Sequence, residues 1–548
     1  MCTPWLAAIA LVSLAPPQSG GGAQGGARVQ GAERWTALPF PTLCMPRPAS
    51  LEAVRLDSGR HLVLPGEELA RAESSVRPEL APAGLLGLLE DEALAAELAI
   101  RFHPSAPPLL ARGDARALEA ARAVLVDLDR AARGFEVELL AWITDGATEL
   151  VSRPAPALFE KRVGAQPVWD ATRVRSGEVA VFGERRELGF VSTYGVEVAT
   201  DSGVADPQVG KILFGRTLHL RACRVRGGRA LHLDGFLDAA ELAELERFET
   251  GTADLGVVQE PRLQVVQIAF SGVVESGGRL AVAVRGSPLR TSDWTLWIEA
   301  RTTPDPPAST PERSGWRALD VALLETAVRD LPLPAPGAGR IESFLWDGEP
   351  EVLGEALAGS NLAQAAELAR PAGGRGETRS PLWGAGVLLA PAAQASSWAE
   401  IDSLVDAAEA RRLAGAELVV RHGALQVALP VVEGMPARVL AGTERTLLVD
   451  YDVQVAQETW MPAPRVEPFF DGVLVQGHLR EGAFVGTVWT ASSAGRSELA
   501  REEIGIGRMQ SVERGVKSAR ADLGAGPPRA ILTAGASAPG VELELRAP

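Results

Sequence analysis

Apolar and polar residues alternate along residues 263–274, and this two-residue period predicts a β-strand. Val266, Ile268 and Phe270 would share one face of the strand, with Gln267 on the other. Similar alternating runs, separated by glycine-rich turns, recur over much of the chain. We therefore expect β-strands to dominate the structure.

One hairpin can be specified closely. Residues 218–225 and 230–233 alternate in polarity and flank Gly227-Gly228, which is typical of two antiparallel strands joined by a tight turn. With a two-residue turn, Arg221 would lie opposite Asp234, and such a cross-strand ion pair contributes about 0.2–1 kcal/mol.

The two tyrosines of the chain, Tyr194 and Tyr451, stand in similar sequences 257 positions apart. The matching sequences are Tyr194-Gly-Val-Glu-Val-Ala199 and Tyr451-Asp-Val-Gln-Val-Ala456, followed at the same spacing by Pro207 and Pro464, Val209 and Val466, and Gly215 and Gly472. An internal repeat of this kind predicts two related modules in tandem. Each tyrosine is expected to pack at the equivalent place in its own module.

Helical spacing of apolar residues is confined to shorter stretches, including 85–95, 117–132 and 319–331. With strands near 109 and at 135–143, the helix at 117–132 would complete a small α/β unit. We therefore predict an α+β fold with two tandem β-rich modules, each preceded by a small α/β or helical segment. The expected segments are 1–23 (signal peptide), 24–80 (irregular), 81–144 (small α/β domain), 145–303 (first β-rich module), 304–316 (linker), 317–407 (helical or irregular) and 408–548 (second β-rich module).

Charge and the N-terminus indicate where the protein works. The formal net charge of −16 argues against nucleic acid and anionic lipid as partners. The apolar run at residues 6–15 has the length of a signal-peptide core and is too short to span a membrane. The protein is therefore expected to be exported, to the periplasm or to the outer membrane. Membrane contact itself is left open.

No motif for catalysis or cofactor binding is present. His219 and His232 would share a hairpin face, with Cys223 opposite His232, but no third metal ligand is evident. Glu136 and Glu138 share a strand face, where solvated charges are a simpler interpretation than an acid/base pair. We therefore expect no catalytic, cofactor-binding or metal-binding residues, no cofactor, and no enzymatic activity.

The cysteines and arginines also have structural interpretations. Export would permit a disulfide between Cys44 and Cys223, although two buried thiols are favoured. The arginines are interpreted as solvated turn residues in an acidic chain; they are Arg185, Arg186, Arg224, Arg226 and Arg229.

The order of the predicted elements resembles the secretin core, the C-terminal part of the channel subunits of type II and type III secretion. Leu128-Asp129 followed by residues 135–138 is similar to the junction that precedes this core. The pieces that follow the family's order are 215–233, 261–284 and 294–298 in the first copy, and 472–489, 529–533 and 541–545 in the second. The family's Val-Pro and Ile-Pro lip sequence is absent, and residues 287–293 stand in its place. The resemblance implies side-by-side assembly of subunits, and the missing lip argues against membrane insertion.

The sequence is compatible with three functions. The favoured one is a non-enzymatic, secretin-like envelope protein that acts by protein–protein assembly. Its expected partners are other proteins of the envelope and, in a homo-oligomer, further copies of the same chain. The second is a pore-forming outer-membrane secretin subunit, because the strand at 263–274 is long enough for a barrel. The third is a secreted glycan-binding protein that presents Trp294, Trp297 and Trp489 on its surface.

Overall fold

The computed structural model describes the strands and their turns together with a few separate positions. The described residues are 36–38, 61–65, 99–101, 109–113, 115, 118–119, 122–123, 126, 136–145, 168–176, 179–198, 203–225, 230–250, 255–289, 293–302, 316–320, 382–384, 387–391, 399, 403, 406, 410, 415–455, 460–501, 506–532 and 539–547. The predicted signal peptide, the predicted helix at 85–95 and the linker at 304–316, apart from its last residue, lie outside them. Within the described part, no helix has the length and apolar character needed to cross a membrane.

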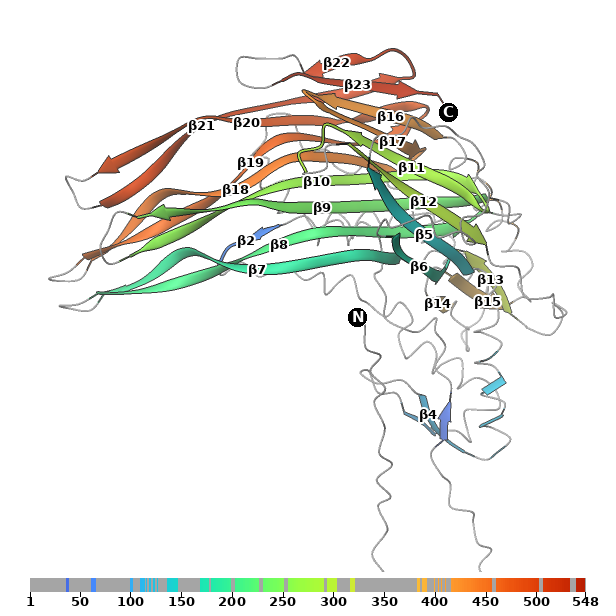
Figure 1. The fold of residues 1–548 in the computed structure, drawn as a ribbon. Coiled ribbons are helices and arrows are strands. Elements are labelled where there is room, and N and C mark those ends of the chain that lie inside the picture. The colour runs from blue at the N-terminus through green and yellow to red at the C-terminus, as the bar shows by residue number, and fades with distance from the viewer. Residues whose placement is uncertain are drawn as a thin grey trace, which may run out of the picture.

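A large antiparallel sheet of nine strands forms most of the molecule (Figure 1). Eight of its strands are long, and they follow one another in the order β7-β8-β9-β10-β18-β19-β20-β21, with short β2 beside β8. Their bounds are β2 Leu62–Val63, β7 Val179–Val198, β8 Gly203–Arg224, β9 Ala230–Glu249, β10 Val257–Glu275, β18 Pro436–Val455, β19 Trp460–Arg480, β20 Ala483–Arg501 and β21 Ile506–Gly524.

A second antiparallel sheet of eight strands packs against one end of the first. Its order is β22-β23-β16-β17-β11-β12-β5-β6. The bounds are β5 Glu136–Asp145, β6 Val168–Arg175, β11 Gly278–Arg285, β12 Trp294–Thr302, β16 Gly415–His422, β17 Leu425–Val432, β22 Arg529–Leu532 and β23 Val541–Arg546. Two three-stranded sheets contain β1 Thr36–Leu38, β3 Ala99–Arg101 and β4 Leu109–Arg112, and β13 Trp316–Asp320, β14 Leu382–Gly384 and β15 Val387–Pro391.

The core lies between the two large sheets. Val266, Ile268 and Phe270 on β10 are fully buried in one cluster with apolar residues of both sheets, which confirms the face predicted for them. Gln267 faces the opposite side of the large sheet, where it is also buried and donates a hydrogen bond to Asp238. The predicted pair of Arg221 and Asp234 is confirmed, at 3.0 Å.

The predicted α+β class is wrong. About 84 % of the described residues lie in strands and only about 4 % in helices. Strand β5 was expected to complete a small α/β unit with the strand at 109, but it pairs with β12 and β6 in the eight-stranded sheet. The helix expected from 319 begins instead with a strand, β13 (Trp316–Asp320). Tertiary pairing outweighs local propensity here, because an isolated short helix gains little, while a strand gains inter-strand hydrogen bonds and cross-strand side-chain contacts from its neighbours.

Candidate functional site: the open edges of the double sheet

The two halves of the chain contribute strands to both sheets in the same order. The first half (β5 to β12) supplies β7-β8-β9-β10 to the large sheet and β6-β5-β12-β11 to the smaller one. The second half (β16 to β23) supplies β18-β19-β20-β21 and β17-β16-β23-β22. The halves meet where β10 pairs with β18 and β11 pairs with β17, which we call the internal junction.

Backbone details recur in the two halves at the spacing of 257 residues. Tyr194 pairs with Pro207 in the hairpin of β7 and β8, and Tyr451 pairs with Pro464 in that of β18 and β19. A bulge interrupts β7 between Val191 and Thr193, and another interrupts β18 between Leu448 and Asp450. The two hairpins therefore share register and distortion, so positions 257 apart are structurally equivalent.

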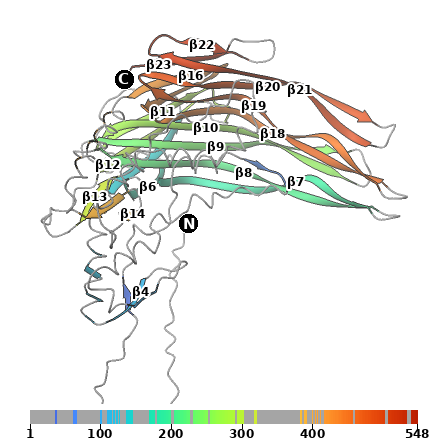
Figure 2. The ribbon, with the colours of Figure 1, turned by 180° about the vertical axis from the view of Figure 1, so that it is seen from behind.

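Glycine marks the point where each half forks. Pairing of β8 with β9 stops at Gly215, and pairing of β19 with β20 stops at Gly472. Both glycines have positive φ, 129° and 158°. A Cβ at Gly215 would lie 2.3 Å from the carbonyl oxygen of Glu184, so a side chain cannot be accommodated without backbone movement. Beyond these glycines, the large sheet separates into hairpins, which extend to one side in Figures 1 and 2.

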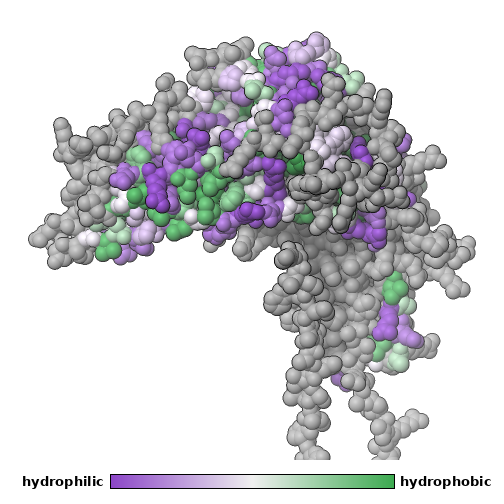
Figure 3. All heavy atoms as spheres, viewed as in Figure 1, coloured by the Kyte–Doolittle hydropathy of each residue, from purple (hydrophilic) through white to green (hydrophobic). Residues whose placement is uncertain are grey.

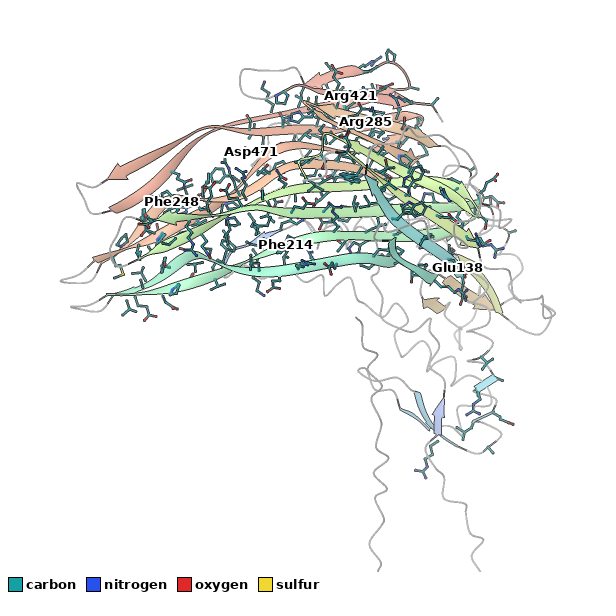
Figure 4. The ribbon with its side chains drawn as sticks, in the orientation of Figure 1. Glu138, Phe214, Phe248, Arg285, Arg421 and Asp471 are labelled. Atoms are coloured by element: carbon teal, nitrogen blue, oxygen red, sulfur yellow. The ribbon has the colours of Figure 1, made fainter. Side chains whose placement is uncertain are left out.

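The separated hairpins pack on one another through the tyrosines. The Tyr194 hydroxyl donates to the carbonyl of Val257 at 3.1 Å, and the Tyr451 hydroxyl donates to that of Thr250 at 3.0 Å. Both rings belong to one apolar cluster at the hairpin tips, where Figure 4 labels Phe248 of β9. Burial raises the pKa of the Tyr451 phenol, so this hydroxyl stays protonated as a donor.

At the internal junction each half covers apolar residues of the other. Strand β19 contacts β7, and the Thr193 hydroxyl donates to the carbonyl of Pro464. Met461 is only 8 % exposed, and Val466 packs against the same tip cluster. On β10, Val265 is fully buried beside β18.

Among the residues that the structure describes, no strand covers the outer strands of each sheet in this way. We call β6 and β7 the first open edge and β21 and β22 the second open edge; Figures 1 and 2 place them at opposite ends of the sheets. Three valines near these edges are strongly exposed: Val204 at 65 %, Val209 at 59 % and Val516 at 44 %. Val204 and Val209 are equivalent to Met461 and Val466, because they lie 257 positions earlier.

Val516 has a buried equivalent too. The pairing of Gly215 with Ala240, and of Gly472 with Ala491, makes β9 and β10 equivalent to β20 and β21 at a spacing of 251 positions. Val516 therefore corresponds to fully buried Val265. Val181 and Leu188, on β7, are also exposed apolar residues of the first open edge. Figure 3 shows hydrophobic and hydrophilic residues intermingled over the long strands on this face.

A buried ionic cluster connects the first open edge to the internal junction. The His61 ring lies 2.8 Å from Asp238 on β9 and 3.3 Å from Glu444 on β18, and Arg185 on β7 reaches Asp238 at 3.2 Å. Burial alone would lower the pKa of His61, but Asp238 and Glu444 outweigh it and raise the pKa to about 10. Burial likewise opposes ionisation of Asp238, yet His61, Arg185 and Gln267 hold its pKa below the ordinary value. The ring is therefore an imidazolium between two carboxylates at neutral pH.

Several residues singled out in the sequence have other roles. Cys223 lies opposite His232, as expected, and is buried; Cys44, its partner in the alternative disulfide, lies outside the described residues. Burial lowers the pKa of His219 to about 4. Among the residues that the structure describes, no group of three His, Cys, Asp or Glu side chains could hold a metal ion. Glu138 pairs with Arg173 across β5 and β6.

Two interpretations of exposed residues are wrong. Trp294 and Trp489 are 2 % and 1 % exposed, so they cannot form a surface platform for glycans; Trp297 is half-buried and stacks on Trp142. Arg185 is not a turn residue but lies in the middle of β7 and binds Asp238.

The cluster and the open edges were not visible in the sequence. His61 stands alone in a stretch without clear periodicity, and its two partners lie 177 and 383 positions away. A second charged pair lies on the smaller sheet, where Arg421 on β16, labelled in Figure 4, donates to Glu544 on β23 at 2.6 Å.

No protein-family model and no curated protein matches the chain. Among solved structures, it is similar to the InvG secretin domain β-barrel from the Salmonella SPI-1 injectisome, at 15 % identity and a TM-score of 0.24, over 52 % of this chain and 92 % of that one. It is also similar to the atomic model of the Salmonella SPI-1 type III secretion injectisome basal body proteins InvG, PrgH and PrgK, at 16 % identity and a TM-score of 0.24, over 52 % of this chain and 64 % of that one. These structural neighbours are secretin-like, but a TM-score of 0.24 is too low to establish a shared fold, so membership of the secretin family stays a prediction.

Proposed function

We propose that this chain is a non-enzymatic envelope protein that assembles end to end, the second open edge of one copy adding to the first open edge of the next. The observation that carries the proposal is the internal junction, where two similar halves already pair through the same kinds of edge strand. It joins β10 and β11 of one half to β18 and β17 of the other, and among the described strands the equivalent ones, β21 and β22 and also β7 and β6, have no further neighbour at the outer edges of the two sheets. The sequence resemblance to secretin cores suggests the cell envelope as the setting.

Burial supports the same contact. An exposed row of backbone donors and acceptors is a template for adding another strand, and exposed apolar residues beside it favour a protein partner. Val204, Val209 and Val516 are exposed where their equivalents at the internal junction are covered. A further copy in the same geometry would cover all three.

The register of the contact follows from the internal junction. Val266 lies opposite Ala441 there. Their equivalents at the open edges are Lys517 and Glu184, so the same pairing between copies would place a lysine opposite a glutamate. The next matching pair would place position 514, an arginine, opposite Glu187. Each opposite-charge pair would contribute about 0.2–1 kcal/mol.

A contact between unlike edges is heterologous, so it forms a closed ring if the rotation per copy closes and an open filament if it does not. In either case each chain would contribute two similar units to the assembly. The charge pairs and valines favour this head-to-tail arrangement over a symmetric dimer, because identical edges would face like charges.

The test is the mass in solution together with a cross-link in register. A chain with Glu184→Cys and Lys517→Cys should form intermolecular disulfides, which raise the mass in steps of one chain. The matched control, Glu187→Cys with Lys517→Cys, is three positions out of register and should cross-link poorly. A wild-type chain that stays monomeric in light scattering at high concentration would refute the proposal.

A further inference from the structure

Strand β2 occupies the fork between β8 and β9. Among the described strands it pairs with β8 alone, through Leu62 with Ile212 and Val63 with Lys211, on the side that β9 has left. The backbone N–H of Leu213 donates to the carbonyl of His61 at 2.7 Å. The N-terminal segment is thus held as an added strand, and we call residues 61–65 the strap.

Three kinds of contact hold the strap. Besides its backbone pairing, the Leu62 side chain is buried in an apolar cluster with Phe190 and Ile212. The third contact is ionic, because the His61 ring, 1 % exposed, bridges Asp238 of the first half and Glu444 of the second. Ionic contacts therefore run from Arg185 on the first open edge, through Asp238 and the strap, to β18 at the internal junction.

The fork of the second half is chemically different. Trp489 stands at the position equivalent to Asp238, and Gly442 at the position equivalent to Arg185. Trp489 is 1 % exposed and packs in an apolar cluster with Phe470. This fork offers an indole where the first offers a carboxylate, so a histidine-bearing strap fits the first fork alone.

We propose that the strap is a detachable element that holds the first open edge and the internal junction in one fixed arrangement, with His61 as its positioning residue. With the strap seated, Asp238 and Glu444 share one cation, and Arg185 is held on β7. When the strap leaves, the two buried carboxyl groups of Asp238 and Glu444, on strands of different halves, lose that cation, and β7 and β18 open locally more often although their backbone pairing with neighbouring strands remains. The consequence for assembly rests on the proposed function: a chain without its strap presents a loosened first open edge to the next copy.

The closing experiment measures hydrogen exchange in the full chain, at a concentration below that of any assembly. In His61→Ala, amide exchange should rise on the order of a hundredfold in residues 183–189 of β7 and 440–446 of β18, because a buried ion pair has been broken. The matched control is His422→Ala on β16, a half-buried histidine whose ring contacts the carbonyl of Gly540. It should leave exchange in both segments at the wild-type rate.

A peptide experiment distinguishes a detachable strap from a residue that only stabilises the fold. A synthetic peptide of residues 57–66 is added in excess to a chain that carries Leu62→Asp and Val63→Pro besides His61→Ala, so that its own strap no longer pairs with β8. The peptide should restore protection of β7 and β18, and the same peptide with His61→Ala should not. Should His61→Ala fail to fold, Glu444→Gln replaces it. That variant keeps the contact of His61 with Asp238, so exchange should rise in β18 and stay low in β7.

Three results would refute the proposal that the strap holds β7 and β18. They are unchanged exchange in both segments, an equal rise over the whole sheet, and no rescue by the peptide. These outcomes are separate from the fate of the proposed function, because exchange is measured on single chains. A wild-type chain that never assembles would refute the proposed function while protection by the strap still stood. Assembly of His61→Ala with wild-type affinity, despite raised exchange, would overturn the link between the two.

Discussion

Replacing the three edge valines is the most direct test of the end-to-end contact. Val204, Val209 and Val516 are 65 %, 59 % and 44 % exposed, whereas equivalent Met461 and Val265 are 8 % and 0 % exposed. Fully burying a valine is worth about 1.5 kcal/mol or somewhat more, so covering the exposed part of each should contribute about 1 kcal/mol. Changing all three to serine should therefore weaken association by about 3 kcal/mol, which is roughly a hundredfold in Kd.

The assay is light scattering over a dilution series, which gives the dissociation constant of the assembled form. Val126→Ser is the matched control, because Val126 is 41 % exposed and lies outside both open edges. It should leave the dissociation constant unchanged. An equal weakening by Val126→Ser, or no weakening by the triple variant, would refute the reasoning that these valines are uncovered halves of a junction.

Three further predictions concern the single chain. His61 should contribute about 3–5 kcal/mol of stability at pH 6. The pKa of His61 in the folded chain is raised above the unfolded value of 6.5, so this contribution should fall as pH rises from 6.5 through about 10. The difference in denaturation midpoint between wild type and His61→Ala should therefore shrink with pH, and a difference that grows would contradict the prediction. Gly215→Ala should lower the free energy of unfolding by about 1–3 kcal/mol or more, measured by thermal unfolding. The control Gly277→Ala also has positive φ but nothing within 4 Å of the added Cβ, so its loss should be smaller. Equal losses would contradict the steric argument. Tyr451→Phe should cost about 0.5–1.5 kcal/mol for the lost bond to Thr250, and an unchanged free energy of unfolding would show that the hydroxyl adds nothing.

Part of the fold follows from local sequence patterns. The alternation around Val266 predicted which side chains face the core, and the Gly-Gly turn predicted the pairing of Arg221 with Asp234. These features depend on neighbours in one strand or one hairpin, so their information is local. The exposed tryptophans were mispredicted because burial of Trp294 and Trp489 depends on strands far away in the chain.

The fold class was mispredicted for a related reason. Residues 319–331 have helical spacing, but the strand at Trp316–Asp320 pairs with β15, about 70 positions later. Propensity describes what a segment does by itself, and it is overridden when a sheet supplies hydrogen bonds and burial together.

The sequence by itself determined the strand around Val266 and one hairpin register, and it predicted the repeat that relates Tyr194 to Tyr451, because alternation and repeated residues are properties of the chain. Only the tertiary structure decided that the two halves share both sheets, that edges remain open at the two ends, and that His61 meets Asp238 and Glu444. Those facts depend on which distant strands pair and on how far burial shifts the balance between charges. Neither is encoded at any single place in the chain.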